Sequence, residues 1–377
     1  MKRLALSLLL AALPASALAQ FETSAPHAVI IDHDTGIVLF EKDARTAIPP
    51  ASMTKIMTAY LVFEALANGD IQEDTEFVVS EEAWRRGGFA SGSSTMALEL
   101  GSSVKVIDLL RGVIIQSGND ACITLAEGLA GSEDAFARRM TDKAREMGLD
   151  SANFLNATGW PDEGHVISPL DLAKLSTRLI QDFPEADRYG LYAEREFTWN
   201  DTRQYNRNPL LGRFTGADGV KTGSTSVSGY GLVGSAERDG TRRTMVINGL
   251  ADASERRTVA LEVMSAAFRD FDIVKVRDTG DRVGEIDVYL GKAETVGVVL
   301  REPAAVAVDR MGRDAVKARI DYVEAVAPVE AGAKVADLIV TRSGEEIGRY
   351  PLYAESDVAR KGFFGRAGAA LVEKIRG

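Results

Sequence analysis

Apolar residues recur every three to four positions through much of the first two thirds of the chain, which is the spacing of helices that bury one face. The segments that this spacing predicts as helices are 52–68, 104–116, 121–129, 133–147 and a stretch that starts at 169. Pro49 and Pro50 stand just before the first segment, and Gly148 follows the fourth, as expected of residues that begin and end helices. Helices therefore dominate this part of the protein, and the Gly- and Ser-rich stretch 85–95 is predicted to be a loop.

Short apolar runs bounded by turn residues predict strands on either side of these helices. The runs are 28–32, 37–40, 219–224, 230–236 and 242–247. Asp239 and Gly240 predict a hairpin between the last two runs, within an antiparallel sheet. We predict an edge strand at 221–224, in which Gly223 lets another backbone approach closely.

The pattern changes near residue 271 from helical spacing to alternation of apolar and polar residues. The alternating segments are 286–290, 306–308 and 316–322, and Pro or Gly residues separate them. We therefore predict two domains, one at 20–272 and a small antiparallel β domain at 273–355. No catalytic constellation stands out in the second domain, which we interpret as a spacer or a docking module.

The end of the chain, 356–377, combines five Lys or Arg residues with apolar residues at helical spacing. The apolar set is Phe364, Ala367, Leu371, Val372 and Ile375. The segment is too charged to span a bilayer, and the pattern predicts a helix lying in a membrane surface. Three glycines weaken such a helix, so a solvated tail stays open as the alternative.

The beginning of the chain has the pattern of an export signal. A basic start is followed by an apolar run over 4–13 and by the small-residue site Ala17-Leu18-Ala19, which predicts a secretory signal peptide at 1–19. Cys122 is the single cysteine, so we expect no internal disulfide and a buried thiol. The formal net charge of −11 argues against general nucleic-acid binding.

The first candidate for chemistry is Ser52-Met53-Thr54-Lys55, at the start of the first predicted helix. Residues three apart on a helix lie on the same side, so Lys55 can serve as the base that a serine nucleophile needs. A serine at a helix start can also be a simple N-cap. Chance alone produces Ser-x-x-Lys about once in a chain of this length, and a second copy indeed lies at 102–105.

Two further polar motifs follow. Ser117 and Asn119 separate two apolar helices, and either break the helix or place polar groups in a cleft. Lys221-Thr222-Gly223 ends a predicted strand, and it is either an ordinary exposed strand end or part of an anion pocket together with Arg242. We prefer Arg242 to its neighbour Arg243, although the two could exchange roles.

The three histidines, His27, His33 and His165, have no metal-ligand spacing, and we expect neither a metal nor a cofactor. His165 lies in a predicted loop, where it could approach a site or simply be solvated.

The three motifs occur in the order of the set found in β-lactamases and penicillin-binding proteins. The stretches Pro-Pro-Ala-Ser-Met-Thr-Lys, Ser-Gly-Asn-Asp-Ala and Asp-Gly-Val-Lys-Thr-Gly-Ser-Thr make the likeness more specific. The chain resembles the low-molecular-mass penicillin-binding proteins, the serine-type D-alanyl-D-alanine carboxypeptidases. The resemblance covers about 25–270 firmly and extends loosely to the C-terminus. It implies an α/β fold, an antiparallel sheet flanked by helices, with an all-helical region that carries Ser52 and Ser117.

The resemblance also implies a role for each matched residue. Ser52 would be the acylated nucleophile, Lys55 its proton acceptor and Ser117 a proton relay between the lysines and the leaving group. The residues implied in substrate binding are Asn119, Lys221, Thr222, Gly223, Ser224 and Arg242. Backbone N–H groups of Ser52 and Ser224 would form the oxyanion hole. Ser224 stands where some relatives have histidine, so only its backbone role is expected to persist.

The implied function is release of the terminal D-alanine from peptidoglycan stem peptides, with β-lactam antibiotics as inhibitors. The protein would work in the periplasm, on the outer face of the cytoplasmic membrane, held by its C-terminal tail. The alternatives are a β-lactamase or endopeptidase on the same fold, and a non-catalytic wall-binding protein.

Overall fold

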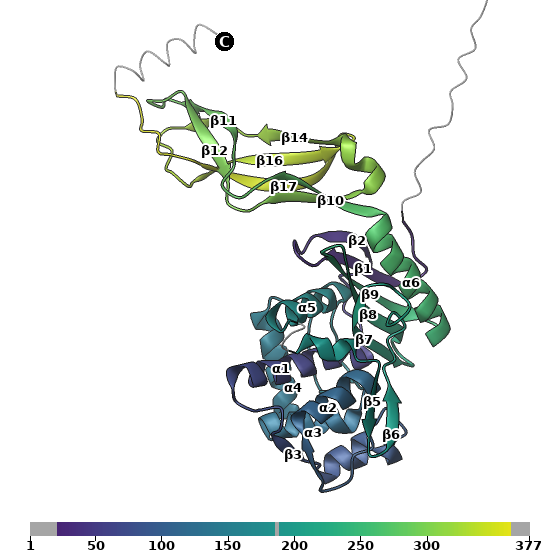
Figure 1. Cartoon of the computed structure of the whole chain (residues 1–377). Helices are drawn as coiled ribbons and strands as arrows, with labels where there is room; N and C mark the ends of the chain where they lie inside the picture. The colour runs from purple at the N-terminus through teal and green to yellow at the C-terminus, as the bar shows by residue number, and fades with distance from the viewer. Residues whose placement is uncertain (1–20, 185–187, 363–377) are drawn as a thin grey trace, which may run out of the picture.

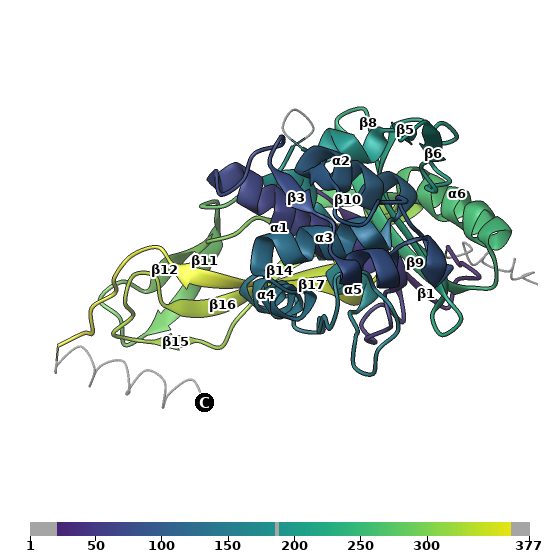
Figure 2. The same ribbon diagram turned by 90° about the horizontal axis from the view of Figure 1, so that it is seen from below.

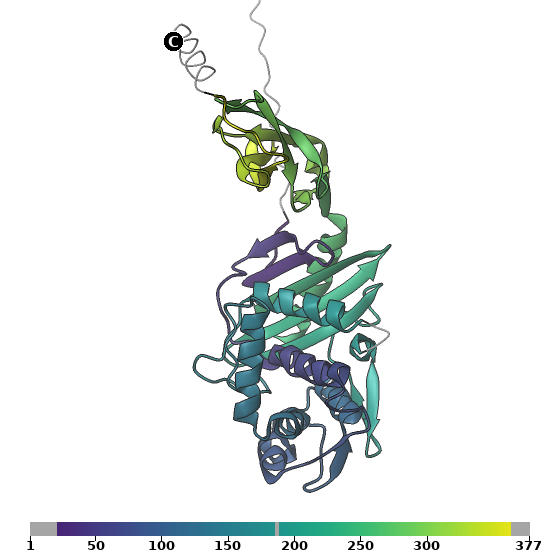
Figure 3. The same ribbon diagram turned by 90° about the vertical axis from the view of Figure 1, so that its left-hand side faces the viewer.

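The computed structural model describes residues 21–184 and 188–362. Figure 1 shows a larger body of helices and strands and a smaller, elongated β body joined at one end of it. Figures 2 and 3 show from two further sides that the β body extends away from the larger one. The predicted signal peptide and residues 363–377 of the predicted tail lie outside the described residues.

The larger body is built on a five-stranded antiparallel sheet with the strand order β2-β1-β9-β8-β7. Its strands are β1 (His27–Asp32), β2 (Val38–Lys42), β7 (Ala217–Thr225), β8 (Gly229–Arg238) and β9 (Thr241–Leu250). β7 is the edge strand, and the β8–β9 hairpin turns at Asp239 and Gly240, so both predictions are confirmed.

Helices cover both faces of this sheet (Figure 1). They are α1 (Lys55–Asn68), α2 (Val106–Arg111), α3 (Asn119–Ala130), α4 (Glu133–Glu146), α5 (Pro169–Asp182) and α6 (Ala253–Arg269). Alternate residues of β1 belong to two cores, because side chains of a strand alternate between its faces. Ala28 and Ile30 pack with α6, whereas Val29 and Ile31 pack with the helices of the other side.

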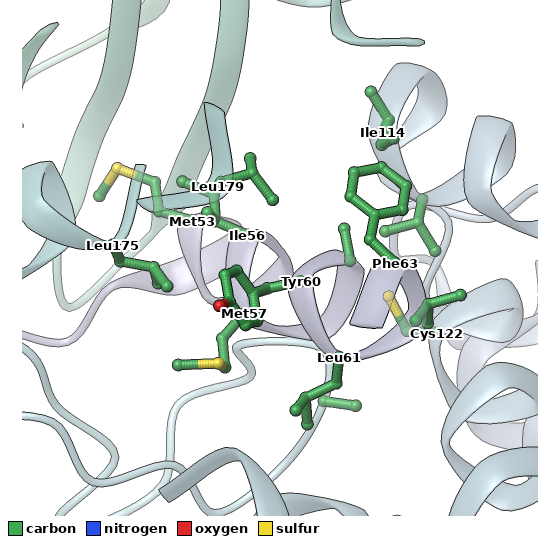
Figure 4. Packing of buried hydrophobic residues seen from close by; sticks show 14 of the residues in the cluster. Met53, Ile56, Met57, Tyr60, Leu61, Phe63, Ile114, Cys122, Leu175 and Leu179 are labelled. Carbon is green, nitrogen blue, oxygen red and sulfur yellow. The ribbon is translucent and has the colours of Figure 1, made fainter. Parts of the chain in front are cut away.

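The central helix is α1, of which eleven of fourteen residues are buried. Figure 4 shows its apolar side chains pointing in several directions, among them Met57 and Leu61, with Cys122 of α3 and Leu179 of α5 nearby. The prediction of a single apolar face was too narrow, since a helix surrounded by others is buried all round. The prediction that Cys122 is a core residue is confirmed.

Two local predictions need correction. The predicted helix at 104–116 begins as strand β4 (Ser103–Lys105) and ends as a π turn (Gly112–Gln116), in which Gly112 packs directly on Met96. The predicted loop at 85–95 starts inside a π turn (Ala83–Gly87) and continues as a 3-10 turn (Phe89–Ser91). Both errors arise because tertiary packing selects local backbone forms that spacing does not reveal.

The smaller body is the predicted β domain. Its six-stranded sheet has the order β14-β16-β17-β12-β11-β15, and β10 pairs with β13 beside it. The strands are β10 (Phe271–Arg277), β11 (Arg282–Tyr289), β12 (Thr295–Leu300), β13 (Ala304–Asp309), β14 (Val316–Asp321), β15 (Ala325–Val326), β16 (Lys334–Arg342) and β17 (Glu345–Ala354). Among the strands of the described residues, only β15 pairs in parallel, with β11. The side chains of the smaller body form a separate hydrophobic core.

Two small two-stranded sheets complete the larger body: β3 (Glu76–Val78) pairs with β4, and β5 (Glu196–Trp199) forms a hairpin with β6 (Thr202–Tyr205). Among residues 21–184 and 188–362, no helix is both long and apolar enough to cross a membrane.

Candidate active site

Ser52 lies in a short 3-10 turn, Ala51–Thr54, that leads directly into α1. Lys55 is the first residue of α1, and its Nζ lies 3.0 Å from Ser52 Oγ. Nζ also donates to Asn119 Oδ1 at 2.7 Å and to the carbonyl oxygen of Thr158 at 2.5 Å. The predicted serine–lysine pair is therefore assembled, with two carbonyl oxygens holding the lysine in place.

Burial makes Lys55 suitable as a base. Only 1% of the residue is exposed, and burial lowers its pKa to about 8. A neutral amine has two N–H groups and one lone pair. Because the oxygens of Asn119 and Thr158 can only accept, they take the two N–H groups, and the lone pair faces Ser52 Oγ.

The second motif meets the first at this point. Ser117 adopts a left-handed backbone conformation (φ 66°) between the π turn and α3, and its buried Oγ has no hydrogen-bond partner in the part of the chain that the structure describes. Asn119 joins Lys55 to Ser93, to which its Nδ2 donates at 3.0 Å. Asn119 is thus engaged with the protein through both ends of its amide, while Ser117 keeps a free hydroxyl.

The third motif lies across the site on the edge strand β7. Lys221 is 3% exposed, and burial together with the nearby charge of Lys55 lowers its pKa well below the ordinary value. A Cβ at Gly223 would stand 2.9 Å from the carbonyl oxygen of Pro50. The predicted close approach of backbones is confirmed, since this glycine lets β7 lie against the turn that carries Ser52.

A pocket of about 210 Å³ opens between these elements. It is lined by Ser52, Ser94, Ser117, Arg207, Thr222, Gly223, Ser224, Tyr230 and Arg256. The structure thus brings together the serines of the first two motifs and the strand residues of the third. Lys55, Asn119 and Lys221 lie behind the wall of the pocket, where they are buried.

The structure does not bring Arg242 into this pocket. Arg242 forms ion pairs with Asp218, at 2.6 Å, and with Glu237, at 2.8 Å. Through the strand pairing, Thr222 lies at the level of Ile247, five residues further along β9. At about 3.4 Å per residue, Arg242 is roughly 17 Å from that level. Its neighbour Arg243 is no substitute, because it is ion-paired with Asp32.

Two arginines that the motifs did not reveal line the pocket instead. Arg207 follows β6 and donates to Ser94 Oγ at 2.7 Å. Arg256, on α6, is 9% exposed, leaves its Nε without a partner, and lies 5.5 Å from the ring centroid of Tyr230. Neither residue belongs to a local pattern, and no signal in the sequence brings these distant segments to one pocket.

His165 is buried beside the site and is not solvated. Its Nδ1 accepts the N–H of Leu155 at 3.1 Å, so its Nε2 carries the proton and donates to Thr54 Oγ1 at 2.8 Å. Burial lowers its pKa to about 4, which keeps the ring neutral. His165 therefore supports the turn of Ser52 from behind and does not enter the pocket.

A serine hydroxyl beside a buried lysine, at a pocket lined by two arginines, is an arrangement typical of serine hydrolases. A model of the D-alanyl-D-alanine carboxypeptidase family, Peptidase S11, matches residues 14–251, and a model of the penicillin-binding protein 5 C-terminal domain matches 271–360. The chain belongs to the D-alanyl-D-alanine carboxypeptidase family, as the resemblance indicated, and is a low-molecular-mass penicillin-binding protein.

Individual relatives agree with this assignment. D-alanyl-D-alanine carboxypeptidase DacC of Escherichia coli is 36% identical over 342 residues, 90% of this chain and 85% of that protein. The structure of penicillin-binding protein 5 from Haemophilus influenzae superposes with a TM-score of 0.77 at 31% identity, over 91% of this chain and all of that one. The predicted fold class is therefore confirmed.

A third relative was solved with an antibiotic bound. Penicillin-binding protein D2 from Listeria monocytogenes, in its cefotaxime-bound form, is 29% identical with a TM-score of 0.58 and covers 66% of this chain and 99% of its own. None of these relatives is named as a β-lactamase or as a non-catalytic protein.

Proposed function

We propose that this protein removes the terminal D-alanine from peptidoglycan stem peptides through an acyl-enzyme at Ser52. Family membership supports the reaction. The observation that carries the assignment of the nucleophile is the 3.0 Å contact between Ser52 Oγ and the buried Nζ of Lys55 at the wall of a cationic pocket. The same attack on a β-lactam ring would trap Ser52 as a stable ester.

The first half of the reaction forms the ester. Lys55 Nζ takes the proton of Ser52 Oγ, which attacks the carbonyl carbon of the penultimate D-alanine. Backbone N–H groups of Ser52 and Ser224 stabilise the oxyanion, a role supported by the position of β7 against the Ser52 turn. Lys55 then returns the proton taken from Ser52 through the hydroxyl of Ser117, which protonates the departing amine, so that D-alanine leaves and Lys55 is neutral again.

The second half hydrolyses the ester. Water attacks the same carbonyl carbon and gives a proton to Lys55, which passes it to Ser52 Oγ as the ester bond breaks. Burial, helped by the charge of Arg207, favours the neutral form of Lys55. Lys221 lies behind the pocket, where burial and the charge of Lys55 lower its own pKa. Asn119 holds Lys55 in position, and its role in holding the substrate backbone would require it to leave Ser93.

The substrate carboxylate binds at the cationic end of the pocket. Arg256 and Arg207 replace Arg242 in this role, together with the hydroxyl of Thr222. A guanidinium can bind a carboxylate with two parallel hydrogen bonds. Arg256 lines the pocket, and its buried Nε has no partner among the described residues. An exopeptidase needs such a group, because a chain end differs from an internal peptide by its charge.

The setting of the enzyme is also part of the proposal. Residues 1–19 direct export to the periplasm, 20–272 form the catalytic domain and 273–355 the β domain. Residues 356–377 attach the protein to the outer face of the cytoplasmic membrane. These boundaries rest on the sequence pattern. The separate hydrophobic core of the β body supports a domain at 273–355.

The decisive test is intact mass after incubation of the mature protein with a penicillin, beside Ser52→Ala. We expect an adduct of one equivalent that maps to Ser52 and is absent from the variant. D-alanine release from a stem pentapeptide, measured in parallel, should also be lost in Ser52→Ala. An adduct on another residue, or D-alanine release that survives in the variant, would contradict the assignment of Ser52.

A further inference from the structure

A second cavity of about 540 Å³ lies beside the β5–β6 hairpin, which Figure 1 shows next to β7. We call it the arginine pocket. Its wall includes Arg195, Glu196, Tyr205, Asn208, Leu211 and Arg213. This volume lies within the range of small-ligand sites, about 300–1,000 Å³. None of the roles proposed above involves these residues.

The cations of the arginine pocket lack carboxylate partners among the described residues. Arg195 lies over Gly212, where a Cβ would stand 3.0 Å from the guanidinium carbon. Arg213 donates only a long bond of 3.4 Å, to the carbonyl oxygen of Pro209. The one acidic residue of the wall, Glu196, is already ion-paired with Arg203. The pocket therefore keeps a net positive charge that an anion can neutralise.

A buried donor in the same wall is also unused. Asn208 is 4% exposed, and its Oδ1 accepts the N–H of Leu210 at 3.0 Å, whereas its Nδ2 has no partner. A buried donor without an acceptor costs about 1–3 kcal/mol. A ligand with oxygen acceptors would satisfy Asn208 and both arginines together.

The arginine pocket adjoins the pocket of Ser52. Arg207 lines the Ser52 pocket, while its neighbours Asn206 and Asn208 line the arginine pocket. One strand-like segment thus forms the wall between the two cavities. The two cavities on either side of this segment therefore lie on the order of 10 Å apart. An extended peptide covers that distance with about three residues, so one substrate can reach both cavities.

We infer that the arginine pocket binds a side carboxylate of the peptidoglycan peptide, outside the D-alanyl-D-alanine end that occupies the Ser52 pocket. The inference rests on the proposed function. It adds that the enzyme selects acidic peptides through Arg195 and Arg213, and that this selection is separate from recognition of the terminal carboxylate.

The test compares two stem pentapeptides that differ only in their side groups, one with free side carboxylates and one with carboxamides in their place. We expect the unmodified enzyme to show a KM about tenfold lower for the acidic peptide, at similar kcat. In Arg195→Gln/Arg213→Gln this preference should disappear, with the KM of the amidated peptide unchanged. Glu196→Gln should strengthen the preference, because it removes the only acidic residue of the wall.

The matched control is Arg138→Gln/Arg139→Gln, which removes two exposed arginines from α4 and changes net charge by the same amount. If this control loses the preference equally, or if the pocket variant impairs both peptides equally, the inference is wrong. Calorimetric binding of both peptides to Ser52→Ala measures the same preference without turnover. That measurement separates a failure of the arginine pocket from a failure of the proposed reaction.

Discussion

The two sides of the Ser52 pocket differ in how their polar groups are satisfied. On the helical side, Lys55 has three oxygen neighbours within 3.0 Å, and Asn119 is bonded through both ends of its amide. On the strand side, and within residues 21–184 and 188–362, Lys221 donates only to a carbonyl at 3.5 Å, and Arg256 leaves its Nε unpartnered. Ser117 Oγ, between the two sides, also has no partner.

This difference indicates that the helical side serves proton transfer and the strand side serves substrate binding. The helical side holds its base in one geometry before any substrate arrives, so little reorganisation is needed when the proton moves. The strand side presents cations and donors whose partners must come from the substrate. Substitutions on the helical side should therefore lower kcat, whereas those on the strand side should raise KM.

The largest effect is expected for Lys55→Met, which removes the base and keeps the buried volume similar. Loss of a positioned base should lower the rate of Ser52 acylation about 10³- to 10⁴-fold. Stopped-flow acylation by a penicillin measures this, and circular dichroism checks that the variant folds. Acylation at the unmodified rate would show that another group accepts the proton.

On the strand side, Arg256→Gln should raise the KM for a stem pentapeptide about 30-fold, with a smaller change in kcat. Arg242→Gln is its matched partner. It should leave KM unchanged and lower the free energy of unfolding by about 2 kcal/mol, through loss of charge-assisted bonds to Asp218 and Glu237. A raised KM in Arg242→Gln together with an unchanged KM in Arg256→Gln would identify Arg242 as the carboxylate-binding residue.

The pH dependence should report the helical side. Lys55 must be neutral to act, and burial lowers its pKa to about 8. Below that pH the fraction of neutral amine falls tenfold per unit, so kcat/KM should rise with pH and level off above about 8. Because Lys221 lies nearby, the inflection belongs to the coupled pair of lysines. A profile that is flat between pH 6 and 9 would argue against a lysine base.

The same lowered pKa has a consequence for stability. Between the folded pKa of about 8 and the ordinary value of 10.5, the unfolded chain binds the additional proton. The contribution of Lys55 to the free energy of unfolding should therefore rise with pH across this window. At pH values below the window, the folded protein bears the full cost of burying the charged amine. Chemical denaturation of the enzyme and of Lys55→Met at pH 7 and 9.5 measures the difference.

The smallest effect is expected from Glu133→Gln. Glu133 accepts the N–H of Ala157 at 3.1 Å and binds Arg86 at 3.0 Å. Glu133 thereby fixes Ala157. The carbonyl oxygen of the next residue, Thr158, accepts a hydrogen bond from Lys55. We expect kcat to fall about threefold and KM to stay constant, with a shifted pH profile that a merely structural role would not produce. Glu82→Gln, which removes the other carboxylate that binds Arg86, should change neither.

Much of the helical side could be predicted from the chain. Pro49 and Pro50 mark the turn, the spacing of Ser52 and Lys55 brings them to one side of a helix, and local geometry completes the pair. Gly223 was predictable for the same reason, because a strand glycine is a local signal of close backbone approach.

The identity of the arginines could not be predicted, and Arg242 illustrates the reason. Strand pairing decides which residues of β8 and β9 stand level with Thr222, and a shift of a few residues along the sheet moves a side chain by many ångströms. Arg207 and Arg256 reach the pocket from a loop after β6 and from α6, which no spacing connects.

The sequence by itself determined the main helices and strands, the three motifs and the family, because these depend on local spacing and on residue type. Only the tertiary structure decided that Lys55 is buried among two carbonyl oxygens and that Arg256 and Arg207 supply the positive charge of the pocket. The physical reason is that burial, pKa and charge balance belong to groups distant in the chain, which folding alone brings together.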